Sequence, residues 1–471
     1  MRAQLQEYRG FSRLIVSLTL VAPLLLTACG GGSDSAAPPP PPSLSITIVP
    51  PTASLPAGGS QVFSATVTGS SNIGVTWSII EGASGGTINN GLYTAPQASG
   101  TYHVRATSQA DTSKSATATV TITSAAAVNF EPTGSMAFAR SGHTATLLLD
   151  GNVLVVGGCD RAGSDYCSPY TSSELYDPAR GVFTATGSTV TGRERHTAVL
   201  LSDGKVLVAG GLNLLNADAT AELYDPSAQS FSRTGSMATA RVRHTATLLT
   251  SGKVLIAGGE AMDGSALASA ELYDPVTGAF SPTGNMLTAR ADFTATLLLN
   301  GRVLIAGGWS SGSAPALAEL YDPAAGTFTS TGSLKVARRG HTATRLIDGQ
   351  VVLAGGYPDG TAAELYDPKS GTFTMTGSMA YSRDGGHSAT LLLDGRVLLA
   401  GGFPATSAGW GNAELFDPAS GTFLPAGVMG TRRAIHTATL LSDGRVLVSG
   451  GCFAATPDGC TGSSASAELY Q

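Results

Sequence analysis

The chain of 471 residues contains 60 glycines and 24 prolines, while only 13% of its residues are charged. This charged fraction is about half of the roughly 25% of ordinary globular domains, which excludes a charge-rich disordered chain and a helical coiled coil. The net charge of −6 gives no support for nucleic-acid binding, because phosphate recognition needs clustered lysines and arginines. Glycines spread among Thr, Val and Leu are typical of short strands joined by tight turns. The composition therefore predicts an all-β protein.

The N-terminus has the pattern of a targeting segment. Arg2, Arg9 and Arg13 precede a short apolar stretch, 14–26, which predicts a signal peptide over residues 1–28. The stretch ends in Leu-Thr-Ala-Cys, which resembles the bacterial lipobox. That resemblance implies cleavage before Cys29, a diacylglycerol on its thiol and sorting to the outer membrane, on its periplasmic or its surface-exposed side. An ordinary secretory peptide with an incidental cysteine is the alternative.

A tether and a first folded unit follow. Residues 29–43 are rich in Gly, Ser and Pro and predict an extended spacer. Residues 44–125 contain alternating apolar and polar stretches, such as 61–67 and 101–106, which predict half-buried strands. With Trp77 on an expected central strand, this unit resembles bacterial Ig-like domains, which implies a β-sandwich. It contains no cysteine, so the inter-sheet disulfide of antibody-type domains is absent.

Residues 127–471 form an internal repeat. Seven Gly-Gly pairs begin at positions 157, 210, 258, 307, 355, 401 and 450. An AELYDP-like segment also occurs seven times, with its glutamate at positions 174, 222, 271, 319, 364, 414 and 468. The pattern resembles the kelch repeat, with Phe in place of the usual outer-strand Trp, and implies a β-propeller.

The phase of the repeat predicts how the ring closes. A Phe recurs six residues after the Asp of each of the first six AELYDP-like segments, but the chain ends before a seventh. The missing copy is present at the other end of the repeat region, as Phe130. We therefore expect seven blades, the last completed by the N-terminal strand of the domain.

The turns and loops of the repeat differ in character. Asp-Gly or related pairs join the first two strands of each copy and favour type I′ hairpins. The loops after Gly-Gly have unrelated sequences, and variable loops on a rigid scaffold are where binding sites are usually built. The sequence therefore predicts that the face carrying the post-Gly-Gly loops is the functional one.

Histidine and arginine recur at fixed positions of the repeat. The histidines are His143, His196, His244, His341, His387 and His436, and Phe293 takes their place in the fourth copy. Because a recurring position that tolerates Phe is not a unique ligand, we expect a structural role. An arginine stands shortly before each of these seven positions. We expect each arginine to pair with the glutamate of the AELYDP-like segment; a ring of anion-binding arginines is the alternative.

The sequence holds no nucleophile elbow, phosphate-binding loop or zinc motif. Galactose oxidase and its relatives also carry kelch-type propellers and bind copper through Tyr, His and Cys, but none of those ligands can be matched here. We therefore expect no cofactor, no metal and no catalytic residue. Asp292, Glu260 and Asp384 are the carboxylates that an enzyme could use, and none has an evident partner in the sequence.

The main hypothesis is a non-enzymatic lipoprotein that binds a glycan or a protein through its loop face. The alternative is an extracytoplasmic carbohydrate-active propeller enzyme, such as a hydrolase, an isomerase or a galactose-oxidase-like oxidase. The expected partners are the membrane, through the lipid anchor, and the ligand; we expect no nucleic acid and a monomeric protein.

The propeller region contains four cysteines in two equally spaced pairs. Cys159 and Cys167 follow the first Gly-Gly, and Cys452 and Cys460 follow the last. An exported protein meets an oxidising compartment, so two local disulfides are expected. Zinc held by four thiolates is the alternative, and pairing between the first and last copies stays open.

Aromatic residues in the loops are the candidate ligand-binding residues. Trp309 and Trp410 lie outside the positions that the repeat conserves, and Tyr357, Phe403 and Phe453 begin, or nearly begin, loops of later copies. Aromatic faces on a rigid rim suit stacking against sugar rings. Packing over their own Gly-Gly hairpins is the alternative.

Overall fold

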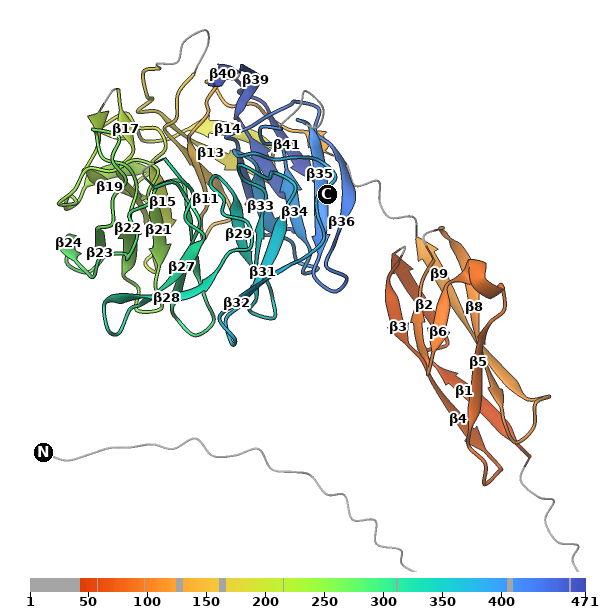
Figure 1. Cartoon of the computed structure of the whole chain (residues 1–471). Helices are drawn as coiled ribbons and strands as arrows, with labels where there is room; N and C mark the ends of the chain where they lie inside the picture. The colour runs from red at the N-terminus through yellow and green to blue at the C-terminus, as the bar shows by residue number, and fades with distance from the viewer. Residues whose placement is uncertain are drawn as a thin grey trace, which may run out of the picture. The chain divides into compact units, whose positions relative to one another are not determined.

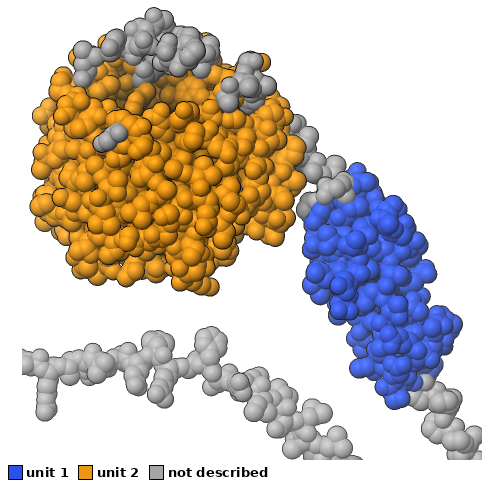
Figure 2. Space-filling view, viewed as in Figure 1, with its two compact units in different colours: residues 1–124 blue, residues 125–471 orange. Residues whose placement is uncertain are grey.

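The computed structural model describes residues 43–471 apart from 57, 97, 124–129, 161–166, 215, 311, 405–409 and 457–458 (Figure 1). The signal peptide, Cys29 and the tether up to residue 42 lie outside the described residues. The chain divides into two compact units, residues 1–124 (unit 1) and 125–471 (unit 2), which Figure 2 colours separately. Among the described residues, no helix has the length and apolar character needed to cross a membrane.

Unit 1 is built from three small sheets. One pairs β1 with β4, the second has the order β2-β9-β8-β5, and the third has the order β3-β7-β6. Phe63, Tyr93, Val104 and Val120 are buried between the sheets, and Trp77 packs against them. The strands are β1 (Ser45–Val49), β2 (Thr52–Pro56), β3 (Ser60–Val62), β4 (Ser64–Thr68), β5 (Val75–Ile79), β6 (Thr87–Asn89), β7 (Leu92–Thr94), β8 (Gly100–Ser108) and β9 (Ser115–Thr123), with a 3₁₀ helix η1 (Gly82–Gly85).

The described residues of unit 2 contain seven four-stranded antiparallel sheets, numbered here by the chain order of their first strands. Sheets 1 to 3 are β11 (Thr144–Leu147), β12 (Val153–Val156), β13 (Ser173–Asp177), β14 (Val182–Ala185); β15 (Thr197–Leu200), β16 (Val206–Ala209), β19 (Ala221–Asp225), β20 (Ser230–Arg233); and β21 (Thr245–Leu248), β22 (Val254–Ala257), β23 (Ala270–Asp274), β24 (Ala279–Pro282). Sheets 4 and 5 are β25 (Thr294–Leu297), β26 (Val303–Ala306), β27 (Leu317–Asp322), β28 (Thr327–Ser333); and β29 (Thr342–Arg345), β30 (Val351–Ala354), β31 (Ala363–Asp367), β32 (Thr372–Met375).

Sheet 6 is β33 (Ser388–Leu391), β34 (Val397–Ala400), β35 (Asn412–Asp417) and β36 (Thr422–Val428). Sheet 7 is β37 (Thr437–Leu440), β38 (Val446–Ser449), β41 (Ala467–Tyr470) and β10 (Phe130–Pro132). Two hairpins lie outside the sheets: β17 (Leu212–Asn213) with β18 (Asn216–Ala217), and β39 (Cys452–Thr456) with β40 (Gly459–Ser463). The β39–β40 hairpin lies at the top of unit 2 in Figure 1.

The first strand of each sheet contacts the first strand of the next, and β37 of sheet 7 contacts β11 of sheet 1. Sheet 7 combines the two ends of unit 2, because β10 pairs with β41 and places Phe130 opposite Tyr470. Their ring centroids lie 5.2 Å apart, close to the 4.8 Å of the Tyr176–Phe183 pair in sheet 1. The N-terminal strand therefore supplies the outer-strand aromatic that the end of the repeat lacks.

The Gly-Gly pairs are required by the packing of the histidine position. In sheet 2, a Cβ on Gly210 would lie 2.6 Å from Cε1 of His244 in the next sheet, and one on Gly211 would lie 2.8 Å from Cβ of His196. Both glycines also have positive φ, +65° and +98°. A larger residue would therefore clash with the histidine and strain the backbone.

The turns between first and second strands differ from the expected type I′. A type I′ turn needs positive φ at both central residues, but in the Asp150-Gly151 turn only the glycine has it, at +86°. The amide of Gly151 donates to the carbonyl of Leu148, and the amide of Leu148 donates to that of Asn152. These are three-residue loops with a left-handed glycine, so the type I′ prediction was wrong.

The expected pairing of arginine with glutamate is confirmed in all seven sheets. Each arginine is buried, and its Nη2 lies 2.5 to 3.0 Å from a carboxylate oxygen of its partner. In sheet 4, Nη1 of Arg290 also donates to the carbonyls of Gly307 and Leu317, while Glu319 accepts the amides of Leu287 and Thr288. Burial lowers the pKa of Arg290, and the charge of Glu319 opposes that shift.

The histidines link neighbouring sheets. In each of the six cases Nε2 lies 2.9 to 3.1 Å from the hydroxyl oxygen that begins the first strand of the preceding sheet. Phe293 interrupts this series, and the buried Oγ1 of Thr245, which such a histidine would meet, has no hydrogen-bond partner. The expected structural role of the histidine position is confirmed.

The orphaned hydroxyl predicts a stabilising substitution. Thr245→Val replaces an unpaired buried hydroxyl with a methyl group and should raise the free energy of unfolding of unit 2 by about 1 kcal/mol. Thr294→Val is the matched control, because Oγ1 of Thr294 bonds His341, and it should lower that free energy by about 1 kcal/mol. Calorimetric melting of both variants measures the difference; equal shifts would contradict the assignment.

The buried histidines also predict an acid-sensitive fold. Burial, followed by the charges of nearby arginines, lowers the pKa of His143 and His341 from 6.5 to about 3. Below pH 6.5 the unfolded chain binds protons that the folded chain does not, so the free energy of unfolding falls as the pH falls towards 3. The slope is up to about 1.4 kcal/mol per pH unit for each histidine.

Denaturant unfolding between pH 7.5 and pH 5 measures this slope, because carboxylates titrate mainly below that window. His341→Phe copies the natural arrangement of sheet 4 and should reduce the slope by the contribution of one histidine. A slope that does not change in this variant would show that the histidines do not carry the effect.

Candidate functional site

The loops after Gly-Gly and the segments that lead into the first strands lie at one end of the sheets, here called the loop face. The residue directly after each Gly-Gly, here called the rim position, forms an isolated β-bridge with the segment leading into the first strand of the same sheet. The rim positions of sheets 1 to 7 are Cys159, Leu212, Glu260, Trp309, Tyr357, Phe403 and Cys452. One backbone arrangement therefore presents seven positions whose side chains differ.

Three of the predicted aromatic residues share this position. Trp309, Tyr357 and Phe403 occupy the rim of sheets 4, 5 and 6, so Trp309 does hold a repeated position, contrary to the sequence interpretation. The signal was available by counting from Gly-Gly, but the residue type varies too much to stand out. These three rim positions belong to consecutive sheets.

The aromatic residues differ in exposure. Tyr357 is 55% exposed, and the guanidinium of Arg339 lies 5.4 Å from its ring centroid. Trp309 is half-buried. Both rings are therefore accessible on the loop face, where an aromatic face with a nearby cation can contact a ligand.

Phe403 and Trp410 have a second, structural contact. Their rings meet edge to face with centroids 5.7 Å apart, and both pack against Cys452 and Cys460. Phe453 is 43% exposed and lies opposite Gly462 in the β39–β40 hairpin. Phe403 and Trp410 thus help to fix the loops of sheets 6 and 7.

The two expected local disulfides are confirmed. Cys159 is bonded to Cys167 and Cys452 to Cys460, with Cα–Cα distances of 5.9 and 5.6 Å. Because all four thiols are used, the alternatives of a four-thiolate zinc site and of pairing between the first and last copies do not hold. The two loops meet through Ser463, whose amide donates to a carboxylate oxygen of Asp160.

The three carboxylates considered for catalysis have distinct surroundings. Glu260 and Asp292 both lie near Arg243, with nitrogen–oxygen distances of 3.2 and 3.5 Å. Asp384 accepts a hydrogen bond from the Ser382 hydroxyl at 2.5 Å. The structure thus brings Glu260 and Asp292 to one guanidinium and leaves Asp384 apart from these contacts.

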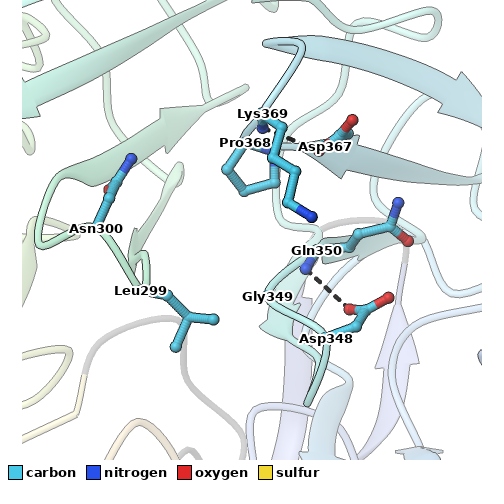
Figure 3. Close-up of a pocket in the computed structure, with 8 residues that line it drawn as sticks. All are labelled: Leu299, Asn300, Asp348, Gly349, Gln350, Asp367, Pro368 and Lys369. Atoms are coloured by element: carbon cyan, nitrogen blue, oxygen red, sulfur yellow. Dashed lines mark hydrogen bonds between the residues drawn. The ribbon is translucent and has the colours of Figure 1, made fainter.

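A pocket of about 370 Å³ lies at the opposite end of the sheets, between turns of sheets 4 and 5. Figure 3 shows Leu299 and Asn300 on one side and Asp348, Gln350 and Lys369 on the other. A second pocket, of about 420 Å³, lies between the equivalent turns of sheets 1 and 2. Since it recurs, this hollow follows from the geometry of the repeat and does not mark a unique site.

Within the described residues, the one group of side chains with metal-ligand spacing is Cys159, Cys167 and Glu194. The two sulfur atoms of that group form a disulfide. The six histidines of unit 2 are buried and use Nε2 to link the sheets. The described donor atoms therefore do not assemble a transition-metal site.

These features define an Ig-like domain followed by a β-propeller-like unit. Residues 44–120 match the family of bacterial Ig-like domains, group 2, so unit 1 contains a bacterial Ig-like domain. No curated protein sequence matches the chain.

Two solved structures resemble the chain. One is a fungal alcohol oxidase of the AA5 family in complex with copper, with 18% identity and a TM-score of 0.61 over 73% of this chain and 76% of that chain. The other is YjhT, with 14% identity and a TM-score of 0.48 over 62% of this chain and 98% of that chain. At 18% identity the likeness to the oxidase concerns the fold alone. Its copper finds no matching group of donors among the described histidine, cysteine, aspartate and glutamate side chains, where the one group with metal-ligand spacing contains a disulfide.

Proposed function

We propose that this protein is a cell-envelope lipoprotein whose unit 2 is a seven-bladed kelch-type propeller, closed by β10, that binds a glycan on its loop face without transforming it. The seven sheets, the contact between β37 and β11 and the pairing of β10 with β41 support the closed ring. In this arrangement each sheet is a blade, and the rim positions surround the mouth of the central channel.

The observation that carries the binding function is the row of aromatic residues at the rim. Trp309, Tyr357 and Phe403 project from the same backbone position on three consecutive sheets. A core residue would recur with one size. The third strands show this, because their buried aromatic residue is Tyr in six sheets and Phe416 in sheet 6. Aromatic rings on a rigid support stack on sugar rings with little loss of conformational entropy. A glycan is therefore the ligand that best fits the row.

The aromatic row predicts which substitutions remove binding. Trp309→Ala and Tyr357→Ala should each weaken binding of a glycan-array hit at least tenfold, because each removes one stacking face. Their melting temperatures should stay within a few degrees of the parent chain. Trp410→Ala, in contrast, should lower the melting temperature, because that ring packs against Phe403.

Leu393→Ala is the control, because Leu393 is a 72% exposed apolar residue in a turn at the opposite end of the sheets. Array binding of the parent chain that survives both Trp309→Ala and Tyr357→Ala would overturn the assignment. So would an array on which the parent chain binds no glycan, even if it binds a purified protein.

The lipobox-like sequence predicts where the protein resides. In a Gram-negative host, the chain should fractionate with the outer membrane, and mass spectrometry should find a diacylglycerol on Cys29. Cys29→Ser removes the acceptor thiol and should release the protein from the membrane, since acyl chains contribute roughly 0.8 kcal/mol per buried CH₂. An unmodified N-terminal Cys29, or unchanged fractionation of the variant, would contradict the anchor.

A further inference from the structure

A charged cluster borders the aromatic row on the loop face. It consists of Arg243 and Glu260 of sheet 3 and Asp292 of sheet 4, whose side chains are 36%, 24% and 37% exposed. Glu260 occupies the rim position next to that of Trp309. The charged cluster therefore occupies positions of the loop face that neighbour the rim position of Trp309.

Arg243 and Asp292 belong to a second repeated position, here called the collar position, which directly precedes the histidine position. Its seven residues all have positive φ, between +51° and +66°: Gly142, Arg195, Arg243, Asp292, Gly340, Gly386 and Ile435. Backbone hydrogen bonds join neighbours along it, such as the amide of Asp292 to the carbonyl of Arg243 at 3.3 Å and the amide of Gly340 to that of Asp292 at 3.1 Å. The collar thus runs from sheet to sheet beside the rim.

The backbone of the collar makes charged residues costly there. Three sheets use glycine, which adopts positive φ freely, whereas any other residue costs roughly 1–2 kcal/mol in the left-handed region. Arg243 and Asp292 adopt φ of +55° and +51°. Arg195 and Ile435 adopt the same conformation, with φ of +51° and +52°, so the collar imposes this cost wherever a side chain replaces glycine.

The cluster does little for the fold. Its ion pairs are partly exposed, and pairs of that kind contribute about 0–1 kcal/mol, less than the strain of two left-handed residues. It also stands outside the repeat, because Glu260 is the one acidic residue at a rim position. A structural requirement would recur in other sheets, as the buried arginine–glutamate pairs do.

The geometry points to a polar subsite, and we propose that Arg243, Glu260 and Asp292 recognise two adjacent hydroxyl groups of a sugar ring stacked on Trp309. This proposal rests on the glycan-binding function above. A carboxylate accepts hydrogen bonds from two neighbouring hydroxyls, and a guanidinium donates to their oxygens. One guanidinium shared by two carboxylates holds all three groups in place before the ligand arrives.

The bridge between Ala291 and Trp309 fixes the relation of the two halves of the site. The amide of Trp309 donates to the carbonyl of Ala291 at 2.7 Å, and Asp292 follows directly in the chain. The carboxylate and the indole are therefore carried by paired segments of one sheet. The indole gives affinity for a ring face, and the charged cluster selects the hydroxyl pattern on its edge.

The test uses methyl glycosides of glucose, galactose and mannose, each with its 2-, 3- and 4-monodeoxy derivatives, titrated calorimetrically against the purified full-length chain. The parent chain should bind at least one glycoside. Two of that glycoside's monodeoxy derivatives, each lacking one of two adjacent hydroxyls, should bind at least tenfold more weakly. Asp292→Asn and Glu260→Gln should weaken binding of that glycoside about tenfold. They should also reduce the difference in affinity between the glycoside and its deoxy derivatives. Asp274→Asn is the control, because Asp274 pairs with Lys253 and lies where β23 ends, at the end of the sheet opposite the loop face.

Trp309→Ala separates this proposal from the function on which it rests. This substitution should lower the affinity for the glycoside and for its deoxy derivatives by the same factor, because stacking does not depend on one hydroxyl. If Trp309→Ala abolishes binding while Asp292→Asn and Glu260→Gln keep full affinity and discrimination, the polar subsite is wrong and the glycan-binding function stands. If Trp309→Ala and Tyr357→Ala have no effect on binding, the proposed aromatic site itself fails.

Discussion

The buried pair of arginine and glutamate is the interaction on which unit 2 depends. Each guanidinium ties together three parts of a sheet: the segment before its first strand, the end of its second strand at Gly-Gly and the start of its third strand. Each glutamate also accepts amides from the segment that arrives from the previous sheet. Removing one partner of such a pair would leave a buried charge unpaired, at a cost of about 3–5 kcal/mol. The pair therefore fixes how successive sheets join, and the loop face is built on those joints.

This arrangement separates what must recur from what can vary. The glycines are fixed, because a Cβ at Gly-Gly would strike the histidine, or Phe293, of the same or the next sheet. The rim side chain is not tied to this packing, so Leu212, Glu260 and Tyr357 share one backbone bridge. A series of near-identical sheets can thus carry a site on only a few of them, and sheets 3 to 6 hold the charged and aromatic residues that the proposed site uses.

The sequence predicted the features that depend on repetition. The number of copies, the missing outer-strand Phe and the pairing of arginine with glutamate were readable because each copy repeats the same local requirement. The features that failed depend on contacts between copies or on backbone torsions. The Asp-Gly turns contain an additional residue that periodicity does not reveal. The rim position of Trp309 could be counted from Gly-Gly, but the residue types there vary too much to show it before the β-bridge to Ala291 is seen. The contact of Arg243 with both Glu260 and Asp292 joins residues of neighbouring sheets, which no single copy contains.

Cysteine, and not an aromatic or charged residue, occupies the rim on both sides of the join between sheets 7 and 1. In sheets 1 to 6 a turn links the third strand to the outer strand of the same sheet. In sheet 7 these two strands are β41 and β10, which come from opposite ends of unit 2 and are held together by three residue pairs. The loops that carry Cys159 and Cys452 meet across the same join, where Ser463 donates to Asp160 and to the carbonyl of Cys159, and the amide of Arg140 donates to Ser464. A local disulfide restricts the unfolded forms of each loop, so the contacts of Ser463 and Ser464 form between segments that are already constrained. In the proposed closed propeller, the rim of these two sheets serves closure, and sheets 3 to 6 carry the proposed ligand site.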